Sequence, residues 1–194
     1  MRIVAALLTM GVFVLAGCGK TEPSCSPAKE IATSSVVRTG NGWDVTITSL
    51  VEAPVDKVVE AASHPDRGHE LLPDSVLKSE IIKDDGNTKV VDLVARVETL
   101  PPGFKVQNIR TEYTYYPQDK RFTTKSIEFK LADITSEYKF APSADGKGTQ
   151  VTMTQQYKGI SPLPESVQKG AICETFTFQV KIMRRALGLD KPAT

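Results

Sequence analysis

The chain has 194 residues, of which 40% are hydrophobic and 24% charged, and its formal net charge at pH 7 is +1. This length and composition fit one ordinary globular domain with additional segments. The charge gives no basic excess that would indicate nucleic-acid binding and no acidic run that would indicate a cation buffer. We therefore expect no nucleic-acid partner and no electrostatic steering of a charged one.

The first 17 residues have the features of an export signal. A positive start at Met1-Arg2 precedes an apolar run from Ile3 to Ala16, which is too short to span a bilayer comfortably. Leu15-Ala16-Gly17-Cys18 resembles the bacterial lipobox, which implies a lipoprotein precursor cleaved before Cys18 and acylated, for example with palmitate, on that thiol. The alternative is an ordinary signal peptide with a chance cysteine. Gly19, in place of an aspartate, favours the outer over the inner membrane, with the protein facing the periplasm.

Residues 18–42 predict a flexible tether, because they are rich in Ser, Thr, Gly, Pro and Lys and show no sustained hydrophobic period. We expect the folded domain over 43–188 and a short tail over 189–194. Two further cysteines are Cys25, in the tether, and Cys173, in the last predicted helix. An oxidising periplasm would allow them to pair. A buried free thiol at Cys173 is the simpler expectation, and the sequence leaves the choice open.

The folded domain is expected to begin with a strand and two short helices. Residues 43–52 alternate apolar and polar side chains, as a half-buried strand does, and Ala53-Pro54 ends this pattern. Apolar residues at 55, 58, 59 and 62 then show helical spacing, and a second short helix is expected over 66–72.

Six more strands are predicted after Pro73, over residues 76–83, 88–99, 105–116, 121–129, 131–141 and 149–158. Polar segments typical of hairpin turns join several of them, at 84–87, 117–119 and 143–148. The strands should therefore form an antiparallel meander, and a meander of this size twists and curls.

A long helix is predicted over 162–187. At 100° per residue its central apolar residues fall within an arc of about 80°, and others widen the apolar sector to about two-thirds of the circumference; the central set is Ile172, Phe176, Val180, Met183 and Leu187. The polar stripe that remains includes Glu174, Lys181 and Arg184. A helix with so much apolar surface has to be wrapped by other elements, and the curled meander is the element available.

This order of elements resembles a known superfamily. A strand, then Ala53-Pro54-Val55-Asp56-Lys57-Val58-Val59-Glu60, then His64-Pro65-Asp66, a strand series and a long final helix is similar to the START-like, helix-grip superfamily called SRPBCC, over residues 43–188. Val59 stands where the family usually has a large aromatic residue. The resemblance implies an α+β helix-grip fold, with a curved antiparallel seven-stranded sheet around the C-terminal helix in β-α-α-β6-α order. It also implies a hydrophobic ligand between sheet and helix, and a minority of the members are enzymes.

Strands that meander alternate direction, so the connections sort into two ends of the predicted sheet. The turns at 84–87, 117–120 and 143–148 are polar, whereas the loops at 71–73, 100–104 and 159–164 are apolar and contain proline. Because loops are normally solvated, we expect the second end to be the mouth of a pocket that touches a membrane or a lipid-bearing protein. The alternative is that these loops pack on one another and on the final helix.

Strand parity predicts which side chains face the interior. Most charges fall on the outer parity, whereas Gln107, Thr111, Ser136 and Gln155, with Thr175 and Gln179 of the helix, are polar groups left inside that need partners. The predicted ligand-binding residues are Phe104, Ile109, Tyr113, Tyr138, Met153, Gln155, Tyr157, Phe176 and Gln179. The tyrosines fit a filled core as well as they fit ligand contact.

No catalytic residue, metal site or cofactor is predicted. The predicted interior has no carboxylate pair, and His64 and His69, even with Glu70 beside them, lack the ligand set of a typical metal site. The main hypothesis is a membrane-anchored domain, attached through Cys18, that binds or transports a hydrophobic small molecule or lipid. The first alternative is a cyclase-, dehydratase- or hydrolase-like enzyme with Tyr113 or Tyr138 as acid, which would need Arg96, Glu98 or Glu112 to point into the cavity. The second is a structural envelope lipoprotein with a filled core.

Overall fold

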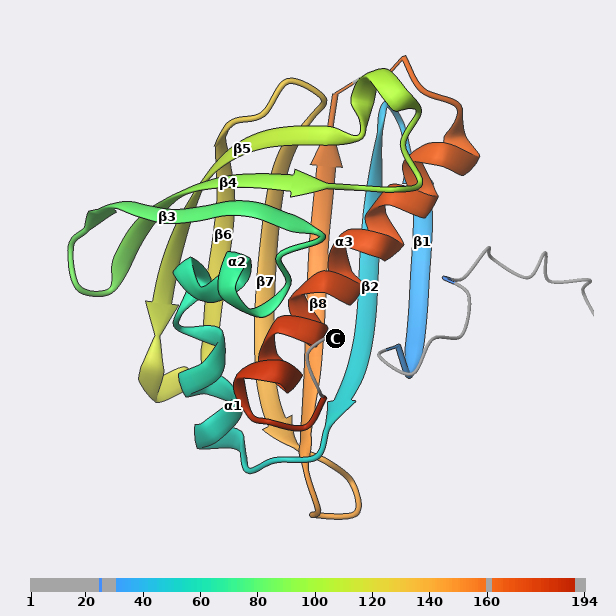
Figure 1. Cartoon of the computed structure of the whole chain (residues 1–194). Coiled ribbons are helices and arrows are strands. Elements are labelled where there is room, and N and C mark those ends of the chain that lie inside the picture. Colours follow the sequence, from blue (N-terminus) through green and yellow to red (C-terminus); the bar gives the residue numbers. More distant parts are fainter. Residues whose placement is uncertain (1–24, 26–30, 160–161, 191–194) are drawn as a thin grey trace, which may run out of the picture.

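The computed structural model describes residues 25, 31–159 and 162–190. Within these residues one antiparallel sheet of eight strands curves around a long C-terminal helix (Figure 1). The strands run in the order β1-β2-β8-β7-β6-β5-β4-β3 across the sheet, and their bounds are β1 Thr33–Thr39, β2 Gly42–Val51, β3 Val76–Asp84, β4 Thr88–Arg96, β5 Val106–Tyr116, β6 Arg121–Glu128, β7 Asp133–Pro142 and β8 Thr149–Lys158. This is the helix-grip arrangement that the sequence predicts, with one additional strand.

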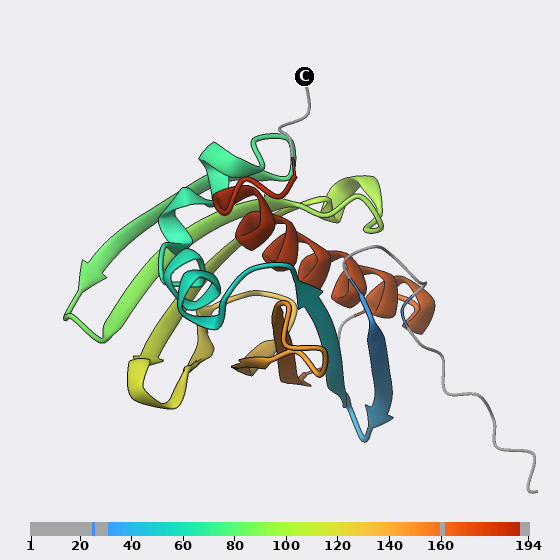
Figure 2. The same ribbon diagram turned by 90° about the horizontal axis from the view of Figure 1, so that it is seen from below.

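The C-terminal helix α3 (Glu165–Ala186) lies in the concave side of the sheet (Figure 2). Pro164 precedes its first turn, where the missing N–H of proline costs little, and Gly188, with φ of +70°, follows its end. Four residues of the predicted apolar arc, Ile172, Phe176, Val180 and Met183, are buried. The wrapped helix is therefore the centre of the hydrophobic core, as its sequence indicates.

Short helices close one end of the concave side. Helix α1 (Val55–Ala62) contacts α3 and β7, and it is followed by a 3-10 turn (Pro65–Arg67) and by α2 (Gly68–Leu71). Further 3-10 turns occur at Pro102–Phe104 and Pro117–Asp119. Among the described residues, no helix combines the length and the apolar character that crossing a membrane requires.

Strand β1 corrects two predictions, the seven-stranded sheet and the tether that extends to residue 42. It pairs with β2 from Thr33 opposite Thr48 to Thr39 opposite Gly42, across a tight turn in which Gly40 has φ of +57°. Sequence periodicity missed it because Val36 is its one fully buried side chain, so backbone hydrogen bonds to β2 contribute much of its stabilisation. The Gly40-Asn41 turn between two β-branched or aromatic segments is the signal that could have revealed it.

A disulfide joins Cys25 to Cys173, with 5.6 Å between the two Cα atoms. The expectation of a free thiol at Cys173 is therefore wrong. Cys25 is therefore held against α3, a position that a free tether would not have given. Cys25 and Ile31 are both buried in the core, so the folded domain begins well before residue 43.

The strand register places residues 100–104, 159 and 162–164 at one end of the sheet, which we call the proline end, and residues 84–87, 117–120 and 143–148 at the other, the hairpin end. The prediction that residues 71–73 join the proline end is wrong, because they lie beside the last turn of α3, where Arg185 donates a hydrogen bond to the carbonyl of Leu71 at 2.6 Å. At the proline end Leu100 is buried, whereas Phe104 is 37% exposed. Part of these loops therefore packs on the domain, as the alternative to a pocket mouth predicted, and part remains open to solvent.

Candidate ligand-binding site

Two adjoining cavities lie between the sheet and α3. The first, the α1-side lobe, has a volume of about 60 Å³ and is bordered by α1, β3–β5 and α3. The second, the proline-end lobe, has a volume of about 110 Å³. Val97, Ile109 and Thr175 line both cavities, so the two lobes are neighbours.

The proline-end lobe is apolar apart from a few amide and hydroxyl groups. Leu100, Gly159 and Leu163 bring the loops of the proline end into its wall. The Gln168 side chain accepts a hydrogen bond from Trp43 Nε1 at 3.0 Å and donates one to the carbonyl of Leu163 at 2.5 Å. This amide therefore ties the start of α3 to β2 and to the loop before the helix. The remaining lining residues are Val97, Gln107, Ile109, Phe129, Leu131, Ala132, Ile134, Gln155, Tyr157, Ala171, Ile172 and Thr175.

The α1-side lobe is narrower. Its polar lining consists of His64, Ser79, Tyr113, Thr175 and Gln179. The Ser79 hydroxyl donates to the carbonyl of Pro65, and the Thr175 hydroxyl donates to the carbonyl of Ala171 at 2.8 Å. The rest of the lining consists of Ala61, Ala62, Pro65, Gly68, Val76, Val91, Leu93, Ala95, Val97, Ile109, Phe122, Phe178, Ile182 and Met183.

Five of the nine predicted ligand-binding residues line these lobes. Ile109 lines both, Tyr113 and Gln179 line the α1-side lobe, and Gln155 and Tyr157 line the proline-end lobe. The strand parity and the helix face inferred from the sequence therefore put these side chains on the correct side of the sheet.

The other four predicted residues line neither lobe. Tyr138 is buried in an aromatic cluster, where its ring stacks on Phe122 with 4.4 Å between the ring centroids. Met153 and Phe176 are each 1% exposed and fill the core. Phe104 lies on the 3-10 turn at the proline end, exposed to solvent. Parity assigns a side chain to a face, but it does not say whether neighbouring side chains already fill the space in front of it.

Trp43, Gln168 and His64 are lining residues that sequence reasoning did not select. Gln168 precedes Ile172 by four positions, so it lies on the apolar arc of α3, and that spacing was the signal that could have found it. Trp43 begins β2 with the same parity as the buried Val45 and Ile47.

Burial raises the pKa values of the interior tyrosines. For Tyr113 burial raises the pKa to about 12, and hydrogen bonding with Gln179 opposes part of the rise. Burial likewise raises the pKa of Tyr115, Tyr138 and Tyr157. These phenols therefore stay protonated at neutral pH, where they can donate or accept hydrogen bonds but are weak acids.

The charged residues that the enzyme hypothesis requires lie elsewhere. Glu112 faces the outer side of the sheet, Glu98 is exposed and pairs with Lys105, and Arg96 is exposed. Neither lobe is lined by a carboxylate or a guanidinium group.

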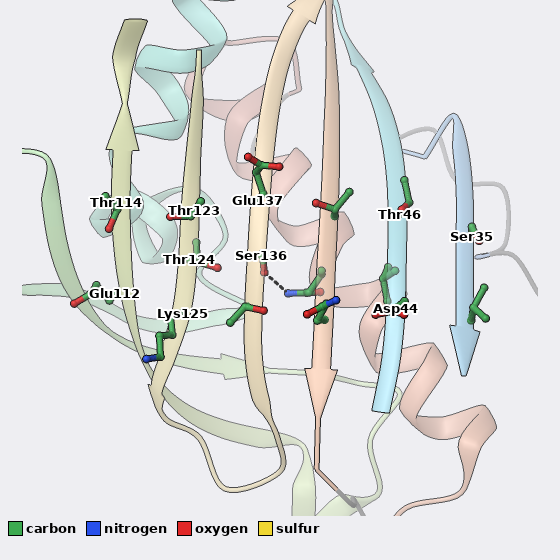
Figure 3. A pocket seen from close by; sticks show the side chains of 16 residues that line it. Ser35, Asp44, Thr46, Glu112, Thr114, Thr123, Thr124, Lys125, Ser136 and Glu137 are labelled. Atoms are coloured by element: carbon green, nitrogen blue, oxygen red, sulfur yellow. Dashed lines mark hydrogen bonds between the residues drawn. The ribbon is translucent and has the colours of Figure 1, made fainter. Parts of the chain in front are cut away.

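A larger hollow, of about 610 Å³, is on the opposite face of the sheet, away from α3 (Figure 3). Serine, threonine and carboxylate side chains of six strands dominate its lining, and Glu112 lies opposite Lys125 in the β5–β6 ladder. Val37 and Val45 are the two apolar side chains of its lining, so this open surface suits a hydrophobic ligand less well than the lobes do.

The two histidines do not converge on a common site. His69 Nδ1 lies 2.7 Å from the carbonyl oxygen of Val76, and Glu70 pairs with Arg67 at 2.9 Å. Across the part of the chain that the structure describes, no group of three or more His, Cys, Asp or Glu side chains is placed to hold a metal ion.

Residues 42–188 match the family described as polyketide cyclase / dehydrase and lipid transport. A STAR-related lipid transfer protein from Xanthomonas axonopodis shares 17% identity and a TM-score of 0.63, covering 86% of this chain and 98% of that chain. A protein from Thermus thermophilus shares 20% identity and a TM-score of 0.63, and the match covers 76% of this chain and 99% of that chain. Zhui aromatase/cyclase from Streptomyces sp. R1128 shares 16% identity and a TM-score of 0.57, and the match covers 74% of this chain and 95% of that chain. No curated protein matches the chain in sequence.

At these identities the structural likenesses show a shared fold, which is the one that the strand order and the wrapped helix define. The family match spans nearly all of the described domain, from the start of β2 to the end of α3. The chain therefore belongs to the polyketide cyclase/dehydrase and lipid transport family.

Proposed function

We propose that this protein binds or transports a hydrophobic small molecule or lipid in the two lobes, while it is anchored in the cell envelope through lipidated Cys18. One observation supports the binding proposal above others: two adjoining, mainly apolar cavities lie between the sheet and α3 and share three lining residues. Burial of apolar ligand surface there contributes roughly 25 cal/mol per Å². The few amides and hydroxyls would orient the ligand.

The volumes of the lobes constrain how a ligand fits. Together they are smaller than the roughly 300–1,000 Å³ of typical small-molecule sites, since the lobes measure about 60 Å³ and about 110 Å³. We propose that a ligand enters at the proline end and that the lobes merge by displacement of the shared side chains Ile109 and Thr175.

Binding suits the lining better than catalysis. His64 and Tyr113 are the titratable groups of the α1-side lobe, and Tyr157 is that of the proline-end lobe. Burial raises the pKa of both tyrosines, which weakens them as acids.

The anchor is proposed from the sequence, because residues 1–17 and Cys18 lie outside the described residues. The lipobox-like Leu15-Ala16-Gly17-Cys18 supports it, and Gly19 favours the outer membrane with the domain facing the periplasm.

A pair of threonine variants tests the binding proposal. Thr175→Leu fills the space between the lobes and should weaken binding of a fluorescent fatty acid at least 10-fold. Thr177→Leu is the matched control, because Thr177 makes the same intrahelical bond, to Cys173 O at 3.0 Å, and lines neither lobe. Equal affinity of both variants and the wild type would contradict the proposal.

A further inference from the structure

The segment before β1 is fixed to the domain at several points. The Cys25 sulfur is bonded to Cys173 of α3, and the Cys25 amide donates a hydrogen bond to the Ser34 hydroxyl at 2.7 Å. Ile31 is buried, and the Ala32 amide bonds to the carbonyl of Thr48 at 2.8 Å. The covalent bond to α3 therefore determines where the chain leaves the folded body.

This attachment shortens the distance that a lipid anchor at Cys18 can span. Seven residues lead from Cys18 to Cys25, whereas thirteen lead from Cys18 to Ile31, the next buried residue. At most about 3.5 Å is covered per residue, so the reach is about 25 Å with the disulfide and about 45 Å if the chain were held only from Ile31 onward.

The short reach is compatible with contact between the proline end and the bilayer. Cys173 is the ninth residue of α3, which places it about 12 Å along the axis from the start of the helix at that end. Phe104 and Val106, at the same end, are 37% and 49% exposed and flank Lys105. Apolar side chains beside a lysine suit the boundary between lipid headgroups and acyl chains.

We propose that the Cys25–Cys173 disulfide acts as a clamp on the anchor, which holds the domain against the lipid surface that carries it and limits ligand exchange to that membrane. This inference rests on the proposed lipid anchor. The partner of the clamped domain is the bilayer in which the lipid anchor is inserted. A domain held in this way does not carry its ligand across to a second membrane.

A chemically anchored protein tests the clamp separately from lipidation in cells. In the chain from Cys18 onward, Cys18 is the free thiol once the disulfide has formed, and it can be coupled to a maleimide lipid in a supported phosphatidylethanolamine bilayer. Neutron reflectometry then measures the distance of the protein layer from the bilayer. We expect the wild type to lie in contact with the bilayer.

Two variants should move the layer outward. Cys25→Ser/Cys173→Ser opens the clamp and extends the reach by up to about 20 Å. An insertion of eight Gly and Ser residues after Gly19 extends the reach similarly while it keeps the disulfide, so it remains informative if the double variant fails to fold. The proposal is overturned if the insertion leaves the layer in place, or if a folded double variant stays as close as the wild type. The intact mass of protein purified from cells tests the lipid anchor independently.

Discussion

Tyr113 and Gln179 show how single residues give the interior its polarity. Both lie on faces assigned from the sequence, one on β5 and one on α3, and both line the α1-side lobe. Hydrogen bonding with Gln179 lowers the pKa of Tyr113 against the effect of burial, and a ligand with a carbonyl or hydroxyl group could bond to either side chain.

The raised tyrosine pKa predicts a loss of stability at high pH. Burial raises the pKa of Tyr113 in the folded state to about 12, above that of the unfolded chain. The stabilising contribution is therefore complete below about pH 10 and is lost as the pH rises through the folded-state value. Tyr113→Phe should reduce the decline of the unfolding free energy between pH 10 and 12 by up to about 1.4 kcal/mol per pH unit. Urea unfolding across that range measures the decline, and identical slopes for both proteins would refute the assignment.

The burial of Arg184 could not be predicted from the sequence of α3. The helical pattern assigns it to the polar stripe of α3, yet it is 3% exposed. Asp190, at 2.8 Å, and Glu52 pair with its guanidinium group and stabilise the buried charge. Both carboxylates come from outside the helix, so the pattern of α3 alone carries no sign of them.

At the scale of elements, the disulfide between the N-terminal segment and α3 should contribute strongly to stability. It closes a loop with a sequence separation of 148 residues. Cys25→Ser/Cys173→Ser should lower the unfolding free energy by about 2–5 kcal/mol, because the unfolded chain regains the entropy that the crosslink removes. Urea denaturation measures this change, and reduction of the wild type should reproduce it. Unchanged stability in both cases would show that β1 and α3 are held without the bond.

The proline end gives a second prediction at this scale. Phe104→Asp should reduce binding to phospholipid vesicles and slow the exchange of a fluorescent lipid with them, because it places a charge where we expect membrane contact. Ile82→Asp is the control, since Ile82 is 45% exposed but lies near the hairpin end, on β3. A flotation assay with vesicles measures binding. Equal effects of the two variants would count against a specific role of the proline end.

Alternation and helical spacing predicted seven of the eight strands and α3 to within a few residues. These signals come from side chains that alternate between core and solvent along one element, as in β8, where Val151 and Met153 are buried. They failed at β1, which has one fully buried side chain. They also gave no sign that Tyr138 and Met153 line neither lobe, because packing between elements, and not periodicity, determines where space remains.

At the scale of the whole molecule, the proposed ligand binding depends on the combination of a curved sheet, a wrapped helix and the space between them. The sheet and α3 enclose a core that is largely filled, as the buried Phe176 shows, with two lobes left at its edges. A structural lipoprotein with a filled core would need no such lobes. The disulfide and β1 fix the N-terminal segment to the domain, and this is the point from which we propose that the anchor extends.

Native mass spectrometry of the mature protein, extracted gently from membranes, tests the central claim most directly. We predict a complex in which one copy of the chain retains an apolar molecule that organic extraction releases and identifies, and we expect Thr175→Leu to lose it while Thr177→Leu keeps it. A wild-type protein that is always recovered without a bound molecule, and that takes up none from added lipid, would contradict the account.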